Sequence, residues 1–227
     1  MPNAIQLPAP TLVCFAVPEE ARPFQRLLGL GQAQNPAVRV AVSGMGRRNA
    51  RAMIDAEFKK EHPGLVLTCG YAGALNPELA LGQIVFRADS KVPNASRLES
   101  LGGRAVRFLH SDTVVVTAVD KARLRAETGA DAVEMESATI RDACRALGIP
   151  SATVRVISDT ASQDMPVDFN ALMTPDSKLS YLRLSGMILK SPKRIPALWS
   201  FGRETRLAAL ALAKYLVRFI DSGNAPG

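Results

Sequence analysis

Residues 65–69 read LVLTC, a short run that is apolar at four of its five positions. A strand covered on one face alternates apolar and polar residues, whereas a strand covered on both faces is apolar nearly throughout. The run leads directly into the glycine-rich turn Gly70-Tyr71-Ala72-Gly73. This combination predicts an interior strand of a parallel sheet that has helices on both faces.

Outward from this run, short β-rich stretches alternate with helical patterns, which is typical of βαβ units and a mostly parallel sheet. We expect strands at 11–17, 38–43, 65–69, 83–86, 113–118, 131–135 and 152–158. We expect helices at 19–28, 47–61, 121–128, 137–147 and 196–220, and a polar loop from 88 to 107. The predicted fold class is α/β, with a central, mostly parallel or mixed twisted sheet flanked by helices. One domain covers residues 1–227, and a basic helical tail occupies about 178–227.

The net charge of +7 is not spread along the chain. From Lys178 onward nine lysines and arginines face two acidic residues, so the tail carries the whole excess and the preceding body is neutral. This distribution disfavours nucleic acid as a partner. No apolar run approaches the roughly 18 residues that a membrane span needs. The N-terminus lacks a signal-peptide pattern, so we expect a cytoplasmic protein.

Cys14, Cys69 and Cys144 are widely spaced and lie in apolar contexts. An odd number without CxxC spacing predicts neither a disulfide framework nor a zinc site. A nucleophilic role for Cys144 is the alternative, but its apolar helix face favours a buried thiol. With only His62 and His110 in addition, we expect no metal and no cofactor.

Acidic and glycine-rich segments follow several of the expected strands. In open α/β sheets, ligands bind at the carboxyl ends of the strands. Glu20 follows the first strand, SGMG (43–46) the second, GYAG (70–73) the third, and Asp159 the last. Each has an ordinary explanation: a first-turn acid for Glu20, tight connections for the glycines, a turn cap for Asp159. Their occurrence at one end of one sheet indicates a binding site.

Five motifs carry a resemblance to a known family. They are SGMG (43–46), CGYAGAL (69–75), LGQIV (81–85), AVEMESA (132–138) and VRVISDTA (154–161). In this order they resemble the purine nucleoside phosphorylase/nucleosidase superfamily over residues 11–173, and in particular its methylthioadenosine/S-adenosylhomocysteine nucleosidase branch. The segment 189–212 also resembles the C-terminus of hopanoid-associated nucleosidases, which release adenine from adenosylhopane.

The resemblance implies a role for each matched residue. Asp159 is the general acid toward the leaving purine, and Glu20 is the carboxylate that activates water. Glu136 holds the ribosyl hydroxyls, Met135 packs against the sugar, and Glu134 supports them. The remaining pocket residues that it implies are Gly70, Tyr71, Ala72, Val114, Ser158 and Phe169. It also implies a homo-oligomer.

The chemistry of the reaction agrees with two kinds of carboxyl group. Cleavage of an N-glycosidic bond passes through a cationic ribosyl group while the departing base gains a proton. One carboxyl therefore has to donate a proton while another stays ionised, as in O-glycosidases. A dry pocket with a like charge nearby raises the pKa of a carboxyl group, and we expect Asp159 to lie in such surroundings.

Hydrolysis and phosphorolysis both occur in this superfamily. Phosphorylases hold phosphate with arginines, one in the first loop and one before the third strand's glycine turn. Here those positions read AVPEEAR, with Glu20, and Thr68-Cys69. Because an anionic base repels phosphate, we favour hydrolysis. Gly44, Gly46 and Arg47 remain a possible anion site, which keeps a phosphorylase as the alternative, and a non-catalytic nucleoside-binding or membrane-surface protein is the second alternative.

The substrate is less well defined than the reaction. Tyr71 and Val114 depart from the nucleosidase pattern, so the 5′ substituent stays open, and a lipid-linked adenosyl group such as adenosylhopane is one candidate. The helix expected at 196–220 combines apolar and basic residues. It either packs on the sheet or meets a membrane surface with its basic face, and the two are compatible.

Overall fold

The central strand of the protein is the one that begins with LVLTC. The computed structural model describes residues 8, 10–29, 37–172, 174, 193 and 195–221, and β3 (Leu65–Ala74) runs through the middle of this part. It pairs in parallel with β1 (Thr11–Phe15) on one side and with β8 (Ser151–Asp159) on the other. The strand is twice as long as predicted, because the glycine turn continues it.

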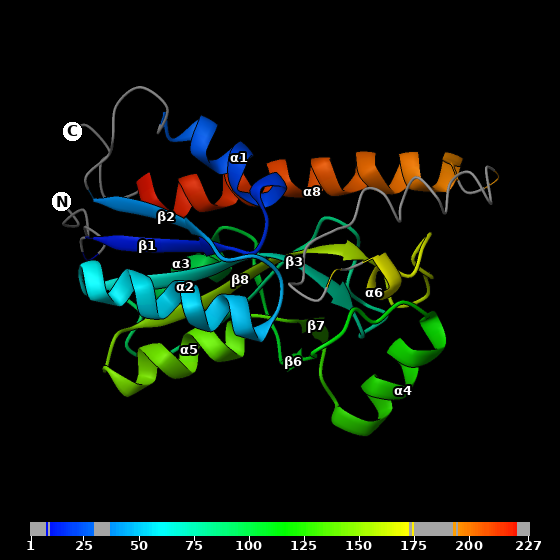
Figure 1. Ribbon diagram of the computed structural model, residues 1–227, viewed down its shortest axis with the longest axis horizontal. Coiled ribbons are helices and arrows are strands. Elements are labelled where there is room, and N and C mark those ends of the chain that lie inside the picture. Colours follow the sequence, from blue (N-terminus) through cyan, green and yellow to red (C-terminus); the bar gives the residue numbers. More distant parts are fainter. Residues whose placement is uncertain are drawn as a thin grey trace.

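The described residues form one eight-stranded sheet, in the order β2-β1-β3-β8-β4-β5, and β7 joins β3 and pairs with β6 (Figure 1). The pairings β1–β2, β1–β3, β3–β8, β4–β5 and β6–β7 are parallel, whereas β4–β8 and β3–β7 are antiparallel. The further strands are β2 (Val38–Val42), β4 (Ile84–Ala88), β5 (Arg104–Ala105), β6 (Phe108–His110) and β7 (Ala132–Glu134). The sheet is therefore mixed and mostly parallel, as predicted.

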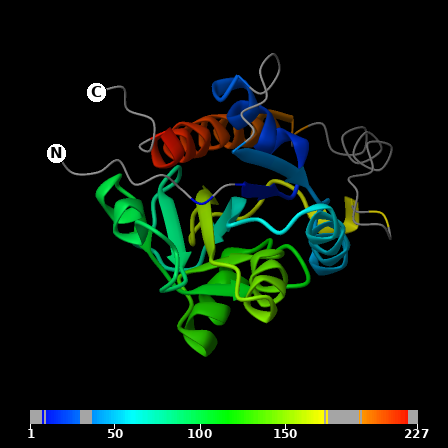
Figure 2. The ribbon, with the colours of Figure 1, turned by 90° about the vertical axis from the view of Figure 1, so that its left-hand side faces the viewer.

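Helices cover both faces of this sheet, as the apolar strands require. The helices are α1 (Pro18–Leu27), α2 (Arg47–Lys60), α3 (Ala95–Ser100), α4 (Ala118–Thr128), α5 (Ser137–Ala146), α6 (Phe169–Leu172) and α8 (Ile195–Asp221). Figures 1 and 2 show α1 and α8 on one face, and α2 and α5 on the other. Alternate residues of β1 enter the two cores: Val13 packs with α8, and Leu12 with α2. All three cysteines are buried free thiols, as expected.

The strand predicted at 113–118 is wrong. Three consecutive valines favour a strand by propensity, yet the segment is a loop that leads into α4. Its backbone binds a side chain of helix α6 instead of a sheet edge: Asn170 Oδ1 accepts from the Val114 N–H, and Asn170 Nδ2 donates to the Val114 carbonyl, both over 2.8 Å. Thr117 then caps α4 by accepting from the Asp120 N–H. Tertiary partners overrode local propensity here.

The polar loop predicted at 88–107 is wrong as well, because it contains α3 and β5. Leu98 of α3 is fully buried, and its carbonyl accepts a hydrogen bond from the hydroxyl of Tyr215 in α8. A segment distant in sequence thus organises this stretch. The short strand β6 was also missed, since its hydrogen bonds depend on β7.

Helix α8 packs on the sheet through its C-terminal half only. Ala208, Leu212, Leu216 and Phe219 are buried against the core, and the helix packs along α1. Between Ile195 and Leu207 no side chain is buried. Much of the predicted basic tail, including Lys178, lies outside the described residues. None of the described helices is both long and apolar enough to cross a membrane.

Candidate active site

Four buried carboxyl groups lie around the second half of β3. Glu20 comes from α1, Glu134 from the end of β7, Glu136 from the N-terminus of α5, and Asp159 from the end of β8. Each side chain is buried, with an exposed fraction of its residue between 3% and 7%. Buried carboxylates need charged or hydrogen-bonding partners, so the partners decide what each group can do.

Arg155 is the partner that three of these groups share. Its guanidinium is fully buried on β8, and its Nη2 lies 2.7 Å from Glu134 Oε2 and 3.6 Å from Glu136 Oε2. Glu20 is close on the other side, because a Cβ at Gly70 would lie 2.6 Å from Glu20 Oε1 and 2.8 Å from Arg155 Nη1. Sequence analysis missed Arg155, although one charged residue in the apolar run 152–158 was a usable signal.

Glu134, for which the resemblance implied a supporting role, holds the end of β7 to the start of α5. Its Oε2 accepts hydrogen bonds from the N–H groups of Glu136 (3.1 Å) and Ser137 (2.7 Å) and from Arg155. Burial alone would raise the pKa of Glu134, but Arg155, His110 and the Ser137 N–H together lower it to about 2. Glu134 is therefore a permanent anion that orients Arg155.

Glu136 has the opposite electrostatic balance. Its Oε1 accepts from the Gly46 N–H over 2.9 Å, at the N-terminus of α2. Burial raises its pKa to about 7, against the opposing effect of Arg155 and with help from the charges of Glu134 and Glu20. Near neutral pH this group can therefore be either a donor or an acceptor toward a hydroxyl group.

Glu20 is held by backbone groups. Its Oε2 accepts from the N–H groups of Ala16 (3.0 Å) and Val17 (3.1 Å), and its Oε1 accepts from the Tyr71 N–H (2.8 Å). Burial raises its pKa, although Arg155 and these N–H groups act in the other direction. A fixed carboxylate with a raised pKa is suited to take a proton from water. The close approach of Glu20 and Arg155, together with φ of +144°, requires glycine at position 70.

Asp159 has a different neighbour from the one we expected. No like charge touches it among the described residues; instead the ammonium Nζ of Lys121 lies 2.6 Å from its Oδ2. The hydroxyl of Ser158 donates to its Oδ1 over 2.6 Å. Sequence analysis missed Lys121, because α4 contains several basic residues and nothing in the sequence shows which one is buried.

The groups predicted as a possible anion site already have partners in this structure. The Gly46 N–H is bound to Glu136, and Arg47 lies 3.3 Å from Asp112 at the surface. Arg47 Nε also donates to His110 Nε2, while His110 Nδ1 lies 3.7 Å from Glu134 Oε1. The Glu134 carboxylate raises the pKa of His110. Gly44 lies beside the side chain of Asn49, in the first turn of α2.

The remaining predicted pocket residues lie in several elements. Ala72 and Ser158 are buried in the adjoining strands β3 and β8, where the Ser158 hydroxyl also approaches the Ala72 carbonyl. Met135 is half-buried between Glu134 and Glu136 in the sequence, and Asn170 joins Val114 to α6, the helix that begins at Phe169.

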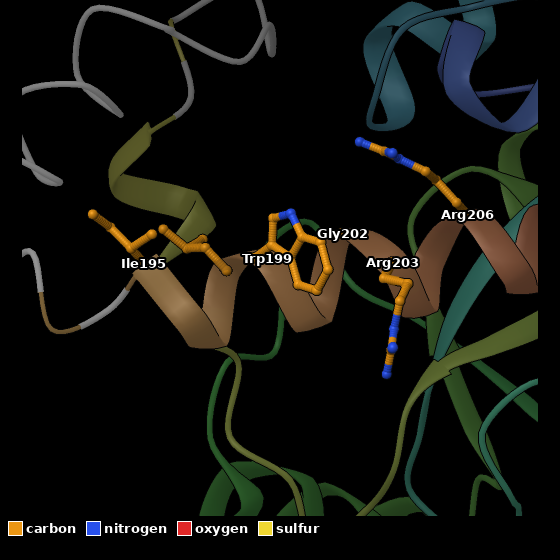
Figure 3. Close-up of a pocket in the computed structure, with 6 residues that line it drawn as sticks. Ile195, Trp199, Gly202, Arg203 and Arg206 are labelled. Carbon is orange, nitrogen blue, oxygen red and sulfur yellow. The ribbon is translucent and has the colours of Figure 1, made fainter.

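Helix α8 borders the same region, which the sequence had not indicated. The hydroxyl of Tyr71 donates to the Thr205 carbonyl over 3.0 Å, and the ring of Phe169 contacts the ring of Phe201, with centroids 5.6 Å apart. The outer face of the helix has a hollow lined by Ile195, Leu198, Trp199, Gly202, Arg203 and Arg206 (Figure 3). One helix thus contacts two of the predicted pocket residues on one side and presents an amphipathic hollow on the other.

A family model described as the phosphorylase superfamily matches residues 103–178, a stretch that includes Lys121, Glu134, Glu136 and Asp159. The predicted resemblance to this superfamily is confirmed over these residues. The match extends over about a third of the chain, and its last residues lie outside the part that the structure describes.

Solved structures with the same fold cover nearly the whole chain. Futalosine hydrolase of Helicobacter pylori is 20% identical, with a TM-score of 0.66, over 93% of this chain and 97% of that one. A Helicobacter pylori 5′-methylthioadenosine/S-adenosylhomocysteine nucleosidase is 21% identical, with a TM-score of 0.67, over 95% and 99%. The Neisseria meningitidis nucleosidase of the same name is 19% identical, with a TM-score of 0.64, over 93% and 98%. The predicted nucleosidase-like fold is therefore confirmed.

Replacement of Arg155 by methionine should destabilise the protein strongly. R155M leaves a permanent buried anion at Glu134 without its counter-charge, which lowers the free energy of unfolding by about 3–5 kcal/mol. Urea denaturation followed by circular dichroism measures this loss. The matched control is R51M, which removes an exposed pair with Asp55 and should leave the free energy of unfolding nearly unchanged. Equal losses in the two variants would contradict the role of Arg155.

Glu136 should make the folded protein less stable as the pH rises. Its pKa is about 7 in the folded chain and about 4.5 when unfolded, so between these values the folded state binds the extra proton. The sign follows: the free energy of unfolding falls by about 3 kcal/mol between about pH 4.5 and pH 8 through this group. E136Q, which retains an acceptor for the Gly46 N–H, should lack this part of the decline. Parallel stability curves for the two proteins would contradict the assignment.

Proposed function

We propose that this protein is a purine nucleoside N-ribosyl hydrolase that releases adenine, with Asp159 as the acid and Glu20 as the base that activates water. The observation that carries the proposal is the position of these groups along β3. A Cβ at Gly70 would lie 2.6 Å from Glu20 Oε1, and one at Gly73 would lie 3.0 Å from Asp159 Oδ2. Three residues of extended strand span about 10 Å, which leaves room for a water molecule and a sugar between the carboxyl groups.

Each group then has a task that its surroundings favour. Glu20 takes a proton from the water that attacks the anomeric carbon, and the bonding electron pair leaves with the base, which gains a proton through Asp159. Glu136, with a pKa of about 7, exchanges hydrogen bonds with the ribosyl hydroxyls, and Met135 beside it packs on the sugar. The anionic Glu134 favours the cationic ribosyl group of the transition state.

The contacts of the other groups favour hydrolysis over phosphorolysis. A phosphate site needs free N–H groups and an available cation. Here the Gly46 N–H binds Glu136, Arg47 pairs with Asp112, and Arg155 binds Glu134. The raised pKa of Glu20 also fits a base for water. Phosphorolysis, with ribose 1-phosphate as product, remains the alternative.

Related structures support a nucleoside substrate with a variable 5′ group. The Neisseria meningitidis nucleosidase was solved with methylthio-immucillin-A, and a Helicobacter pylori nucleosidase with butyl-thio-DADMe-Immucillin-A. We propose a 5′-substituted adenosine as the substrate class for this chain. The exposed apolar half of α8 beside Tyr71 and Phe169 is compatible with a substituent as large as a lipid.

Adenine release from a panel of 5′-substituted adenosines tests the proposal. We expect release without phosphate, and a loss of about 10²–10⁴-fold in kcat for both E20Q and D159N. E19Q is the matched control, because Glu19 is the exposed neighbour of Glu20, and it should keep full activity. Strict dependence on phosphate would favour the phosphorylase. Binding without release from any nucleoside would favour a non-catalytic protein.

We also propose that the first half of α8 meets an anionic membrane surface. Trp199 is 72% exposed and Leu207 61%, next to the exposed Arg203 and Arg206. Exposed apolar and basic side chains on one helix are the composition of interfacial helices.

Sedimentation with vesicles of phosphatidylglycerol and phosphatidylcholine measures this contact. R203E/R206E should lose at least about half of the bound fraction on anionic vesicles, whereas the same charge change at Arg48 and Arg123 should not. Equal binding of both double variants, or none by the unmodified protein, would contradict the contact. The homo-oligomer and the cytoplasmic location stay predictions, and light scattering of the purified protein would test the assembly.

A further inference from the structure

Lys121 is a completely buried lysine whose three N–H groups all have acceptors. Its Nζ lies 2.6 Å from Asp159 Oδ2, and it donates to the carbonyl groups of Thr160 (2.8 Å) and Gln163 (2.7 Å). An ammonium group has three protons to donate, so this arrangement satisfies it fully. Burial of a lysine is unfavourable without such partners, and an apolar residue would fill the space of the stem without that difficulty.

We propose that Lys121 and Asp159 act together as the acid of the reaction: Lys121 stores the proton that Asp159 passes to the leaving base. The inference deepens the hydrolase proposed above and rests on it. In the free protein Lys121 is the ammonium group that donates three hydrogen bonds, and Asp159 is the carboxylate that accepts one of them.

The transfer balances as follows. When the glycosidic bond breaks, its electron pair stays on the base, which becomes strongly basic. The Lys121 Nζ passes a proton to the Asp159 carboxylate, and the base takes the proton of the resulting carboxyl group, so Asp159 ends as a carboxylate again and Lys121 as a neutral amine. Water gives its hydroxide to the anomeric carbon and its proton to Glu20. Release of products lets Glu20 lose that proton to solvent and Lys121 regain one.

The contacts of Lys121 suit both proton positions. As an ammonium group it donates three hydrogen bonds, and as an amine it still donates two, which are enough for the Thr160 and Gln163 carbonyls. Neither carbonyl loses its donor during turnover. A side chain that only braced the loop would not need an acceptor that can itself hold a proton.

The other charged groups near Lys121 and Asp159 have partners of their own. From β8, Asp159 is in contact with Nζ; on α4, Asp120 binds Arg123 at the surface. Asp164, in the loop after β8, accepts from the Ala118 N–H. The Arg155 guanidinium pairs with Glu134 and Glu136. Among the described residues, Lys121 is therefore the group that can supply a proton to Asp159.

Two substrates distinguish the contribution of the proposed acid to the rate from the contribution of the rest of the site. An adenine nucleoside needs a proton on its leaving base, whereas 4-nitrophenyl β-D-riboside has a leaving group that departs as an anion and needs only the Glu20 half. We expect K121M to lose about 10²–10⁴-fold in kcat on the adenine nucleoside at about pH 8, and at most about threefold on the nitrophenyl riboside. The loss on the nucleoside should shrink as the pH falls, because the solvent then supplies the proton that Lys121 no longer stores.

K121R distinguishes a stored proton from a fixed charge. Arginine keeps the positive charge but does not release its proton, so K121R should stay as slow as K121M on the adenine nucleoside. R123M, an exposed change on the same helix, is the matched control and should retain both activities. Recovery of the nucleoside rate in K121R would overturn the proton store, as would equal losses on both substrates in K121M.

The unmodified protein offers a second measurement in case the variants do not fold. Its kcat on the adenine nucleoside should change with pH, above neutrality, in the same way as its kcat on the nitrophenyl riboside, because the proton for the leaving base is held inside the protein on Lys121. An alkaline decline near neutrality on the nucleoside alone would overturn the inference. If the unmodified protein cleaves neither substrate, the proposed hydrolase itself fails, which is a different outcome.

Discussion

The ion pair between Arg155 and Glu134 is the interaction on which the rest of the candidate site depends. One buried guanidinium, 2.7 Å from Glu134 and 3.6 Å from Glu136, allows three glutamates to lie together in a dry pocket. Without this cation, burial would favour protonation of all three groups. With it, Glu134 stays ionised while the pKa of Glu136 rises to about 7, so neighbouring carboxyl groups acquire different chemistry.

Strand β3 sets the geometry around this pair. Its parallel pairing with β1 and β8 brings the ends of both strands to one edge of the sheet. Glycines at 70 and 73 then let Glu20 and Asp159 approach the strand backbone from two elements that are far apart in the sequence. A larger side chain at either position would displace one of the carboxyl groups. The spacing between them is therefore a property of the strand.

Two buried cations divide the site into two electrostatic halves. Arg155 pairs with the glutamates, which surround the proposed water and sugar. Lys121 pairs with Asp159, which faces the proposed base. A permanently charged guanidinium suits a group that must orient others, whereas an ammonium group can give up a proton. The two halves also come from different parts of the fold, since Arg155 lies on the central sheet and Lys121 on the peripheral helix α4.

The sequence by itself determined the α/β class, the apolar interior strands and the order of the motifs, because burial on both sheet faces and strand-end glycines leave local patterns. It placed Glu20 and Asp159 after strands for the same reason, and the family resemblance added Glu134 and Glu136. Only the tertiary structure decided that residues 113–118 form a loop, that α3 packs under α8, and which cations meet the carboxylates. A lysine on a helix has the same local signature whether it faces solvent or Asp159. Its partner lies 38 residues away in the chain and is chosen by packing alone.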